Sequence, residues 1–296
     1  MAAGETIAFI GAGNMGRPMI RHLVRAGHRV IASVRRPELA AELSHLGAAV
    51  AGSPAEAAVT ASFVFTNVTS TPDVEEVLLG PSGAVRTAQP GTICVDFSTI
   101  SPLVTRDIAR RLEAAGMAML DAPVSGGVKG AEAATLSIMV GGRAEVFRRA
   151  EPLLSVLGKV ITHVGESGAG QTAKACNQIV QVVNIEGIAE AMRFCTALGV
   201  DPANVLTAIS AGMAGSKMLD LMGPKMAARD FAAGIEARLH AKDFGLVHET
   251  ALAAGIELPA TECVRELLQC LLDHGWGRDD TSSLLRVLEE LLGKGG

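Results

Sequence analysis

Short apolar runs alternate with stretches of helical periodicity as far as His163, and this alternation constrains the fold more than any other feature of the chain. The runs are IAFI at 7, RVIAS at 29, SFVFTN at 62, TICVDFS at 92, MAMLD at 117, LSIMVGG at 136 and VITHV at 160. Strands that alternate with helices usually pair in parallel, because each helix returns the chain to the same edge of the sheet. We therefore expect an α/β region with a doubly wound, mostly parallel sheet.

Three helix starts in this region share a capping signal, a hydroxyl residue followed by a proline suited to the first helical turn. They are Ser53-Pro54, Thr71-Pro72 and Ser101-Pro102. The pattern predicts that the hydroxyl residue caps the helix in each case.

After His163 the strand-like runs stop, and the remaining chain is predicted to be all helical. We expect two domains, residues 1–165 with the sheet and residues 166–296 with helices only. One long helix, about residues 168–198, joins them, and we expect it to border a ligand cleft between the domains.

Composition excludes several classes of function. The 296 residues are 49% hydrophobic and carry a formal charge of −5 without a long Lys/Arg run, which argues against nucleic acid or an anionic membrane as the main partner. The five cysteines lack paired CxxC spacing, so no disulfide framework or zinc site is predicted. With no signal-like or membrane-spanning segment, we expect a soluble cytoplasmic protein that needs no metal.

The first chemical motif lies between the strand at 7 and the next helical pattern. It reads Gly11-Ala12-Gly13-Asn14-Met15-Gly16. Glycines in this context permit a tight turn and the close approach of a pyrophosphate to a helix N-terminus. We expect a Rossmann-type dinucleotide site, and the alternative is a glycine-rich turn that binds nothing.

The end of the second strand indicates which dinucleotide binds. An acidic residue there would hold the ribose hydroxyls of NAD, but the chain reads Ser33-Val34-Arg35-Arg36-Pro37. Arg35 and Arg36 can clamp a 2′-phosphate, which favours NADP(H). The alternative is that both arginines are solvated residues at a helix start.

A second glycine-rich segment follows the strand at 117. Ser125, Gly126 and Gly127 can present several backbone N–H groups to a carboxylate or a phosphate. An ordinary tight turn explains this segment equally well when it is taken alone.

Amide side chains and one ammonium group form a narrow stripe along the otherwise apolar long helix. The stripe contains Gln171, Lys174, Gln178 and Gln181, with Asn177 and Asn184 beside them. We expect it to face a polar cavity, where Lys174 would donate or accept a proton. The alternative is a solvent-facing stripe.

Together these motifs resemble the β-hydroxyacid dehydrogenase family, which includes 3-hydroxyisobutyrate dehydrogenases. The resemblance covers nearly the whole chain. It is carried by FIGAGNMGRPM at 9, VDFSTISP at 95, LDAPVSGGVKGAEAATLSIMVGG at 120, GAGQTAKACNQIV at 168 and AKDFGL at 241. It implies hydride transfer between a nicotinamide and a small β-hydroxy acid or semialdehyde.

The resemblance also assigns roles to individual residues. It implies that Lys174 is the catalytic residue, that Ser125, Gly126 and Gly127 hold the substrate carboxylate, and that Thr99 and Lys242 lie near the cofactor. Asn177 and Gln178 match the substrate-side amides, and Phe231 matches an aromatic residue of the substrate pocket. The Asn177-Gln178 pair is more similar to the members that reduce tartronate semialdehyde than to the branched-chain members.

The chain departs from the family pattern at three places. Val34 replaces an acidic or amide residue, Ala134 replaces a glycine, and DFAAGI around Phe231 lacks the usual proline and second phenylalanine. We expect a homodimer or homotetramer, since the helices after Val200 are apolar. His240, Asp243 and His248 are interpreted as a partly solvated face. A dinucleotide-sensing binding module remains the non-enzyme alternative.

Overall fold

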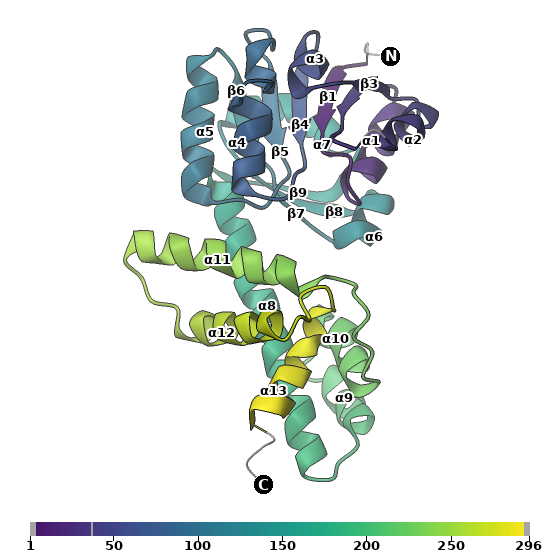
Figure 1. Ribbon diagram of the computed structural model, residues 1–296, viewed down its shortest axis with the longest axis vertical. Helices are drawn as coiled ribbons and strands as arrows, with labels where there is room; N and C mark the ends of the chain where they lie inside the picture. The colour runs from purple at the N-terminus through teal and green to yellow at the C-terminus, as the bar shows by residue number, and fades with distance from the viewer. Residues whose placement is uncertain (1–3, 37, 293–296) are drawn as a thin grey trace. The chain divides into compact units, whose positions relative to one another are not determined.

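The computed structural model describes residues 4–36 and 38–292. Backbone contacts divide the chain into two compact units, Met1–Lys174 and Ala175–Gly296 (Figure 1). The division falls inside one continuous helix, α8, which runs from Ala169 to Ala197.

The described residues of the first unit form a nine-stranded sheet with the order β3-β2-β1-β4-β5-β6-β8-β7, and β9 pairs with β8. The strands are β1 Thr6–Ile10, β2 Arg29–Ser33, β3 Ala49–Ala51, β4 Phe63–Thr66, β5 Ile93–Asp96, β6 Ala118–Asp121, β7 Val124–Ser125, β8 Leu136–Gly141 and β9 Gly158–Gly165. Pairing is parallel except where β8 meets β6 and β7. The predicted mostly parallel sheet is therefore confirmed, while β3 and β7, of three and two residues, were not predicted.

Helices connect the strands of the first unit. They are α1 Gly16–Arg25, α2 Leu39–His45, α3 Pro54–Ala58, α4 Thr71–Leu79, α5 Pro102–Ala114, α6 Gly127–Glu132 and α7 Ala144–Leu154, with a 3₁₀ turn at Ala84–Arg86. The strand order 3-2-1-4-5-6 is that of a Rossmann fold, in which ligands bind at the carboxyl ends of the strands.

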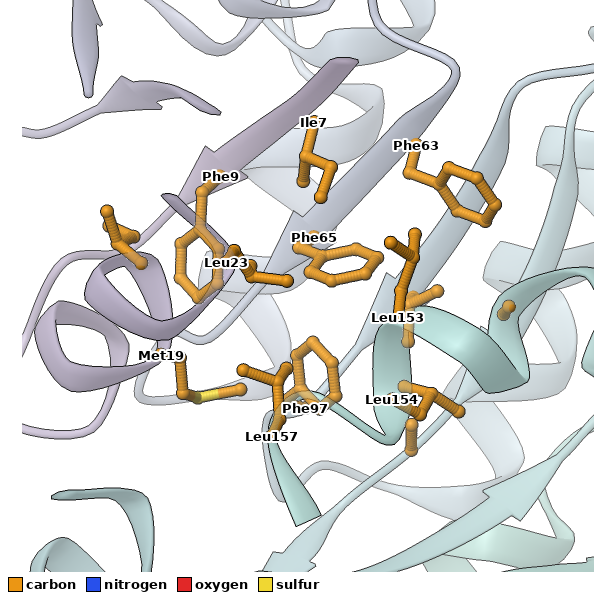
Figure 2. Close-up of a cluster of buried hydrophobic side chains, with 14 of the residues drawn as sticks. Ile7, Phe9, Met19, Leu23, Phe63, Phe65, Phe97, Leu153, Leu154 and Leu157 are labelled. Carbon is orange, nitrogen blue, oxygen red and sulfur yellow. The ribbon is translucent and has the colours of Figure 1, made fainter. Parts of the chain in front are cut away.

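Alternate side chains of β1, β2, β4, β5 and β6 enter two different cores, one on each face of the sheet. On β1, Ile7 and Phe9 join a cluster formed with α1 and α7, whereas Ala8 and Ile10 join a cluster formed with α3, α4 and α5. Figure 2 shows the first cluster, where the rings of Phe65 and Phe97 meet edge to face at 5.2 Å. Both faces of these strands are covered, so they read as continuous apolar runs. The outer strand β9 is largely exposed.

Two of the three predicted helix caps are correct. The Ser53 and Ser101 hydroxyls accept the backbone N–H groups of Glu56 and Val104. The third was wrong by one position, because Ser70 rather than Thr71 caps α4. The hydroxyl of Thr71 instead accepts the backbone N–H of Ser101.

The second unit is helical over its described residues, apart from an isolated β-bridge between Glu236 and Asp280. It contains most of α8, followed by α9 Pro202–Ser210, α10 Lys217–Ala227, α11 Ala237–Ala254, α12 Pro259–Asp273, a 3₁₀ turn at Thr281–Ser283 and α13 Leu284–Leu292. Buried side chains of α8, such as Val182, Ile185 and Met192, form its core with α10 to α13. Within the described ranges, no helix is long and apolar enough to cross a membrane.

Candidate active site

A cavity of about 610 Å³ lies at the carboxyl ends of β1, β2 and β4. Its lining includes Gly11 and Gly13 from the glycine-rich turn, Arg35 and Arg36 from the turn after β2, and Val68 from the turn after β4. The structure thus brings the two predicted cofactor motifs to one cavity.

The glycines of this turn have different surroundings. Gly11 has a φ of +100°, and a Cβ added there would lie 2.2 Å from the backbone oxygen of Asn67. A Cβ on Gly16 would lie 2.1 Å from the backbone oxygen of Gly11, so this glycine permits α1 to pack against the turn. A Cβ on Gly13 would meet nothing within 4 Å. Gly13 therefore leaves open space in the cavity through which a pyrophosphate can approach the backbone. The residues present fit a dinucleotide.

Asn14 and Met15, which lie between Gly13 and Gly16, support the turn and do not line the cavity. The amide oxygen of Asn14 accepts a hydrogen bond from Arg17 at 3.1 Å, and Arg17 also binds both carboxylate oxygens of Glu42 on α2. Met15 precedes α1 and packs against the core. Both side chains therefore fix the position of the turn.

Arg35 and Arg36 are both exposed at the rim of the cavity. The Arg35 guanidinium forms an ion pair with Asp73 at 3.1 Å, and the Arg35 side chain is 78% exposed. A pair this exposed is weak, and it engages one nitrogen of a group that has five N–H donors. Arg35 therefore retains donors for an anion.

Two fully buried carboxyl groups end neighbouring strands beside the start of α8. Asp121 accepts the backbone N–H groups of Gly168 at 2.8 Å and of Gln171 at 2.9 Å, so it caps the first turn of α8. Asp96 accepts the Thr66 hydroxyl and the Ser98 N–H through Oδ1. Burial raises the pKa of Asp96 to about 6, against the lowering effect of the Ser98 and Thr66 hydrogen bonds. Burial also raises the pKa of Asp121, although the helix N–H groups oppose this.

The first turn of α8 packs unusually close to the sheet. A Cβ on Gly170 would lie 2.4 Å from the backbone oxygen of Met139 and 2.6 Å from that of Asp121. One turn later Lys174 is 8% exposed. The glycines before the lysine therefore allow the helix to start directly on the ends of β6 and β8.

The amide stripe of α8 is bonded to protein groups and is not a solvated face. Gln171 binds the loop that contains Thr99, through Ser98 and Ile100, and Thr99 itself is half-buried. Further along, Asn177 donates to Gln178 at 2.9 Å, and Gln178 donates to Asp243 at 2.6 Å. The solvent-facing alternative is thereby excluded.

Asp243 of α11 extends this network in the second unit. Its other carboxylate oxygen lies 3.0 Å from the ammonium nitrogen of Lys242. On the same helix, His240 contacts Gln181 at 3.3 Å and the Thr281 hydroxyl at 2.8 Å. His240 and Asp243 are 1% and 7% exposed, so the interpretation as a partly solvated face was wrong for these two residues, whereas the His248 side chain is 31% exposed. Within the described ranges, no cluster of three or more His, Cys, Asp or Glu residues could hold a metal.

The loop at Ser125 has the backbone geometry that glycine permits. Ser125 ends β7, Gly126 has a φ of +127°, and Gly127 has a φ of +61° and begins α6. Both glycines are exposed, and the first N–H groups of a helix have no partner within the helix. The loop can therefore present donors to an anion.

Ala134, where the resemblance implies a glycine, lies in the connection between α6 and β8. Its φ is +54°, in the left-handed region that disfavours residues with a Cβ. The departure identified in the sequence therefore corresponds to local backbone strain.

Phe231 lies in a cluster of arginines in the second unit. The guanidinium groups of Arg229 and Arg286 lie 5.8 and 5.3 Å from the centre of its ring. Its backbone oxygen accepts the N–H of Asp280, whose carboxylate binds the N–H groups of Gly234 and Ile235. The contacts of Phe231 thus hold the segment around 231–235 in place.

Asp96, Asp121 and Asp243 carry no functional role in the pattern of the sequence. A signal for the first two was present, since each is the acidic last residue of an otherwise apolar strand. No comparable signal marked Asp243, because its partner Gln178 is 65 residues away in the chain.

Comparisons with known proteins agree with this architecture. The family model for the NAD-binding domain of 6-phosphogluconate dehydrogenase matches residues 6–165, and the model described as NAD-binding of NADP-dependent 3-hydroxyisobutyrate dehydrogenase matches residues 168–288. The fold and the site therefore define an NAD(P)-binding oxidoreductase that acts on hydroxyl groups.

Relatives along the full chain narrow the assignment. The 2-hydroxy-3-oxopropionate reductase of Escherichia coli is 42% identical over 96% of this chain and 97% of its own. The NAD-dependent L-serine dehydrogenase of Pseudomonas aeruginosa is 35% identical over 98% of this chain and 100% of its own. The 3-hydroxyisobutyrate dehydrogenase of Mycobacterium tuberculosis, solved with L-serine, has a TM-score of 0.89 and 35% identity, covering 96% of this chain and 99% of its own. The chain belongs to the β-hydroxyacid dehydrogenase family.

Proposed function

We propose that the chain is an NADPH-dependent reductase that converts tartronate semialdehyde, which is 2-hydroxy-3-oxopropionate, to glycerate. The observation that carries the proposal is the burial of Lys174 in a helix stripe whose other polar side chains are amides. The 42% identity to an enzyme of this name supports the substrate, and Arg35 and Arg36 at the cavity rim support the cofactor.

In the proposed mechanism, the chain binds both reactants and moves one proton. The cofactor, when bound, supplies the hydride. The Gly11–Gly16 turn would hold its pyrophosphate, Arg35 and Arg36 its 2′-phosphate, and Thr99 and Lys242 would lie near it. Lys174 Nζ would give a proton to the carbonyl oxygen as that oxygen gains charge, and would take it back in the oxidation direction.

The substrate would be oriented through its carboxylate and its hydroxyl. Backbone N–H groups at Ser125, Gly126 and Gly127 would hold its carboxylate. The Asn177 nitrogen donates to Gln178 and, at 3.4 Å, to Gln181, which leaves the Asn177 amide oxygen as an acceptor for the substrate hydroxyl. Gln178 would then act mainly by fixing Asn177, since its own nitrogen binds Asp243.

This arrangement distinguishes the candidate substrates. Methylmalonate semialdehyde carries a methyl group where tartronate semialdehyde carries the hydroxyl, so the Asn177 acceptor would be left unpaired. Succinate semialdehyde has one more carbon between its carboxylate and its carbonyl, which would misplace the carbonyl relative to Lys174.

A second candidate is oxidation of L-serine or 3-hydroxyisobutyrate with NAD. It is favoured by the 35% identity to the L-serine dehydrogenase and by the likeness to the 3-hydroxyisobutyrate dehydrogenase solved with L-serine. The two candidates differ in cofactor and in substrate, so one set of assays separates them.

The test compares kcat/KM for the three semialdehydes with NADPH and with NADH, followed by loss of reduced-cofactor absorbance. Glycerate, L-serine and 3-hydroxyisobutyrate are tested in the reverse direction. We expect tartronate semialdehyde with NADPH to give the highest value. A higher value for L-serine or for a semialdehyde without the hydroxyl would reject the substrate, and no turnover with any of them, despite cofactor binding, would favour a binding module.

We also propose that the chain forms a homodimer or homotetramer. Val180 and Phe194 of α8, and Leu198 directly after it, are 73%, 68% and 64% exposed and lie at spacings that place them on one face of the helix. An apolar stripe of this kind is usually buried by a partner. Light scattering of the purified protein gives the mass that decides this.

A further inference from the structure

The side chain of Gln171 joins the first turn of α8 to the loop that follows β5. Its amide nitrogen donates to the backbone oxygen of Ser98 at 2.7 Å, and its amide oxygen accepts the backbone N–H of Ile100 at 3.1 Å. These two backbone groups flank Thr99 on either side. Because Gln171 is 1% exposed, water does not compete with the two hydrogen bonds.

The backbone of Gln171 is held by a different group. Its N–H donates to Asp121 at 2.9 Å, so the first turn of α8 is fixed to the end of β6. The loop on the other side is fixed as well, because Ser98 donates its N–H to Asp96 and accepts the N–H of Val68 through its hydroxyl. Gln171 is therefore a direct side-chain link between two anchored segments.

Lys174 lies one turn after Gln171, on the same face of the helix. We propose that Gln171 is a positioning residue that sets the distance between the Lys174 ammonium and the Thr99 segment. This inference rests on the proposed function, in which Lys174 protonates the substrate and Thr99 lies at the cofactor. In that setting the Gln171 side chain fixes the geometry between proton donor and hydride donor without touching either reactant.

The amide group is chemically required for this link. It supplies one donor to Ser98 and one acceptor to Ile100 at the same time. Methionine has a similar length and supplies no donor. An ionised glutamate supplies only acceptors and would face the Ser98 carbonyl oxygen, whereas a protonated glutamic acid supplies one donor and one acceptor, as glutamine does.

The first experiment compares Gln171→Met with the wild type. We expect kcat to fall by roughly 10- to 100-fold, because small errors in position are costly to turnover, while NADPH affinity measured by fluorescence titration changes less. Hydrogen exchange at the Ile100 amide should accelerate, since that amide loses its acceptor. Thermal unfolding of the NADPH-bound protein shows whether the variant is folded.

The second experiment uses Gln171→Glu and follows kcat from about pH 8 to about pH 5. We expect the ratio of variant to wild-type kcat to rise as the pH falls, because protonation restores the donor to Ser98. The charged groups around this position are Asp96 on β5, Asp121 on β6, Arg106 on α5, which binds Ser167, and Lys174. Dividing the variant kcat by the wild-type kcat at each pH removes the effect of these groups on the profile. Gln89→Glu, at an exposed glutamine, is the matched control, and its ratio to the wild type should stay constant with pH.

Several outcomes overturn the positioning role. They are wild-type kcat in Gln171→Met, unchanged exchange at Ile100, and a Gln171→Glu ratio that stays constant with pH. If the wild type turns over none of the semialdehydes, the proposed function fails instead, and this result does not depend on any Gln171 variant.

Discussion

Asp96 and Asp121 are paired in register at the ends of the adjacent parallel strands β5 and β6, and both are 0% exposed. Two carboxyl groups in this position cannot both ionise without cost, because burial disfavours the charged form and the charges repel. Asp121 is stabilised as an anion by the first turn of α8, whereas Oδ2 of Asp96 has no hydrogen-bond partner among the described side chains. Asp96 is therefore the member of the pair that retains its proton to higher pH.

Asp96 should make stability depend on pH in a specific window. Its pKa of about 6 lies above its value in the unfolded chain, so the folded protein binds the proton more tightly. The contribution is fully present below about pH 4 and is lost as the pH rises through about 6. In Asp96→Asn we expect the loss of unfolding free energy over this window to shrink by roughly 3 kcal/mol. Urea unfolding across the range measures it. If the unfolding free energies of variant and wild type change in parallel with pH, the prediction is contradicted. Asp121, whose pKa is also raised, contributes a slope of the same sign in both proteins.

Ala134→Gly should stabilise the protein. Relief of the positive φ outweighs the greater freedom of glycine in the unfolded chain, and the expected gain in unfolding free energy is about 0.5–1 kcal/mol. The neighbouring Ala133 has a φ of −88°, so Ala133→Gly is a matched control that should give no gain. Equal effects at the two positions, measured by urea unfolding, would show that the left-handed backbone is not the cause.

Gly13→Ala and Gly16→Ala should separate binding from folding. At Gly13 the added methyl enters open space, so stability should change by less than about 0.5 kcal/mol while NADPH affinity falls tenfold or more. At Gly16 the methyl meets backbone, and unfolding free energy should fall by about 1–3 kcal/mol. Fluorescence titration and thermal unfolding of both variants give the comparison. A Gly16→Ala protein as stable as the wild type would refute the packing role of Gly16. Wild-type NADPH affinity in Gly13→Ala would refute the cofactor-binding role of Gly13.

Arg35→Ala should raise the KM for NADPH and leave the KM for NADH little changed. In the wild type we expect kcat/KM to favour NADPH by one or two tenfold steps, each about 1.4 kcal/mol. Arg110→Ala, at an exposed arginine of α5 paired with Asp107, is the control for a general loss of positive charge. Equal efficiency of the wild type with both cofactors would reject the role of Arg35 in choosing NADPH.

Lys174→Ala should lower kcat by roughly 10²–10⁴ with cofactor affinity nearly intact, which is the usual range for loss of a general acid. Lys174→Arg should not restore activity, because arginine keeps the charge but does not release its proton near neutral pH. The exposed Lys159→Ala is the control. Near-normal turnover in Lys174→Arg would mean that the residue only binds an anion.

The sequence predicted the sheet because β1, β2, β4, β5 and β6 are apolar runs covered on both faces. It did not predict β3 and β7, which are too short to produce a run of their own. Residues within one motif, such as Gly11 to Gly16, were placed correctly in a single turn because their spacing is local.

Long-range hydrogen bonds could not be predicted in this way. The Gln171 side chain meets Ile100 and Ser98 across 71 and 73 residues of chain, and no pattern in one sequence specifies such a pair. The motif around Phe231 predicted a place in the substrate pocket but not the contacts of its ring. Those contacts come from Arg229 and Arg286. The role of Phe231 in the substrate pocket stays a prediction.

The continuity of α8 limits how this enzyme can be recombined with its relatives. The boundary between the compact units falls after Lys174, so a chimaera joined there would take the lysine turn from one parent and the turn with Asn177 and Gln178 from the other. Crossovers placed before Gly165 keep the helix from a single parent and preserve the register of these side chains. Exchange of substrate preference between members of the family is therefore best attempted with α8 transferred whole.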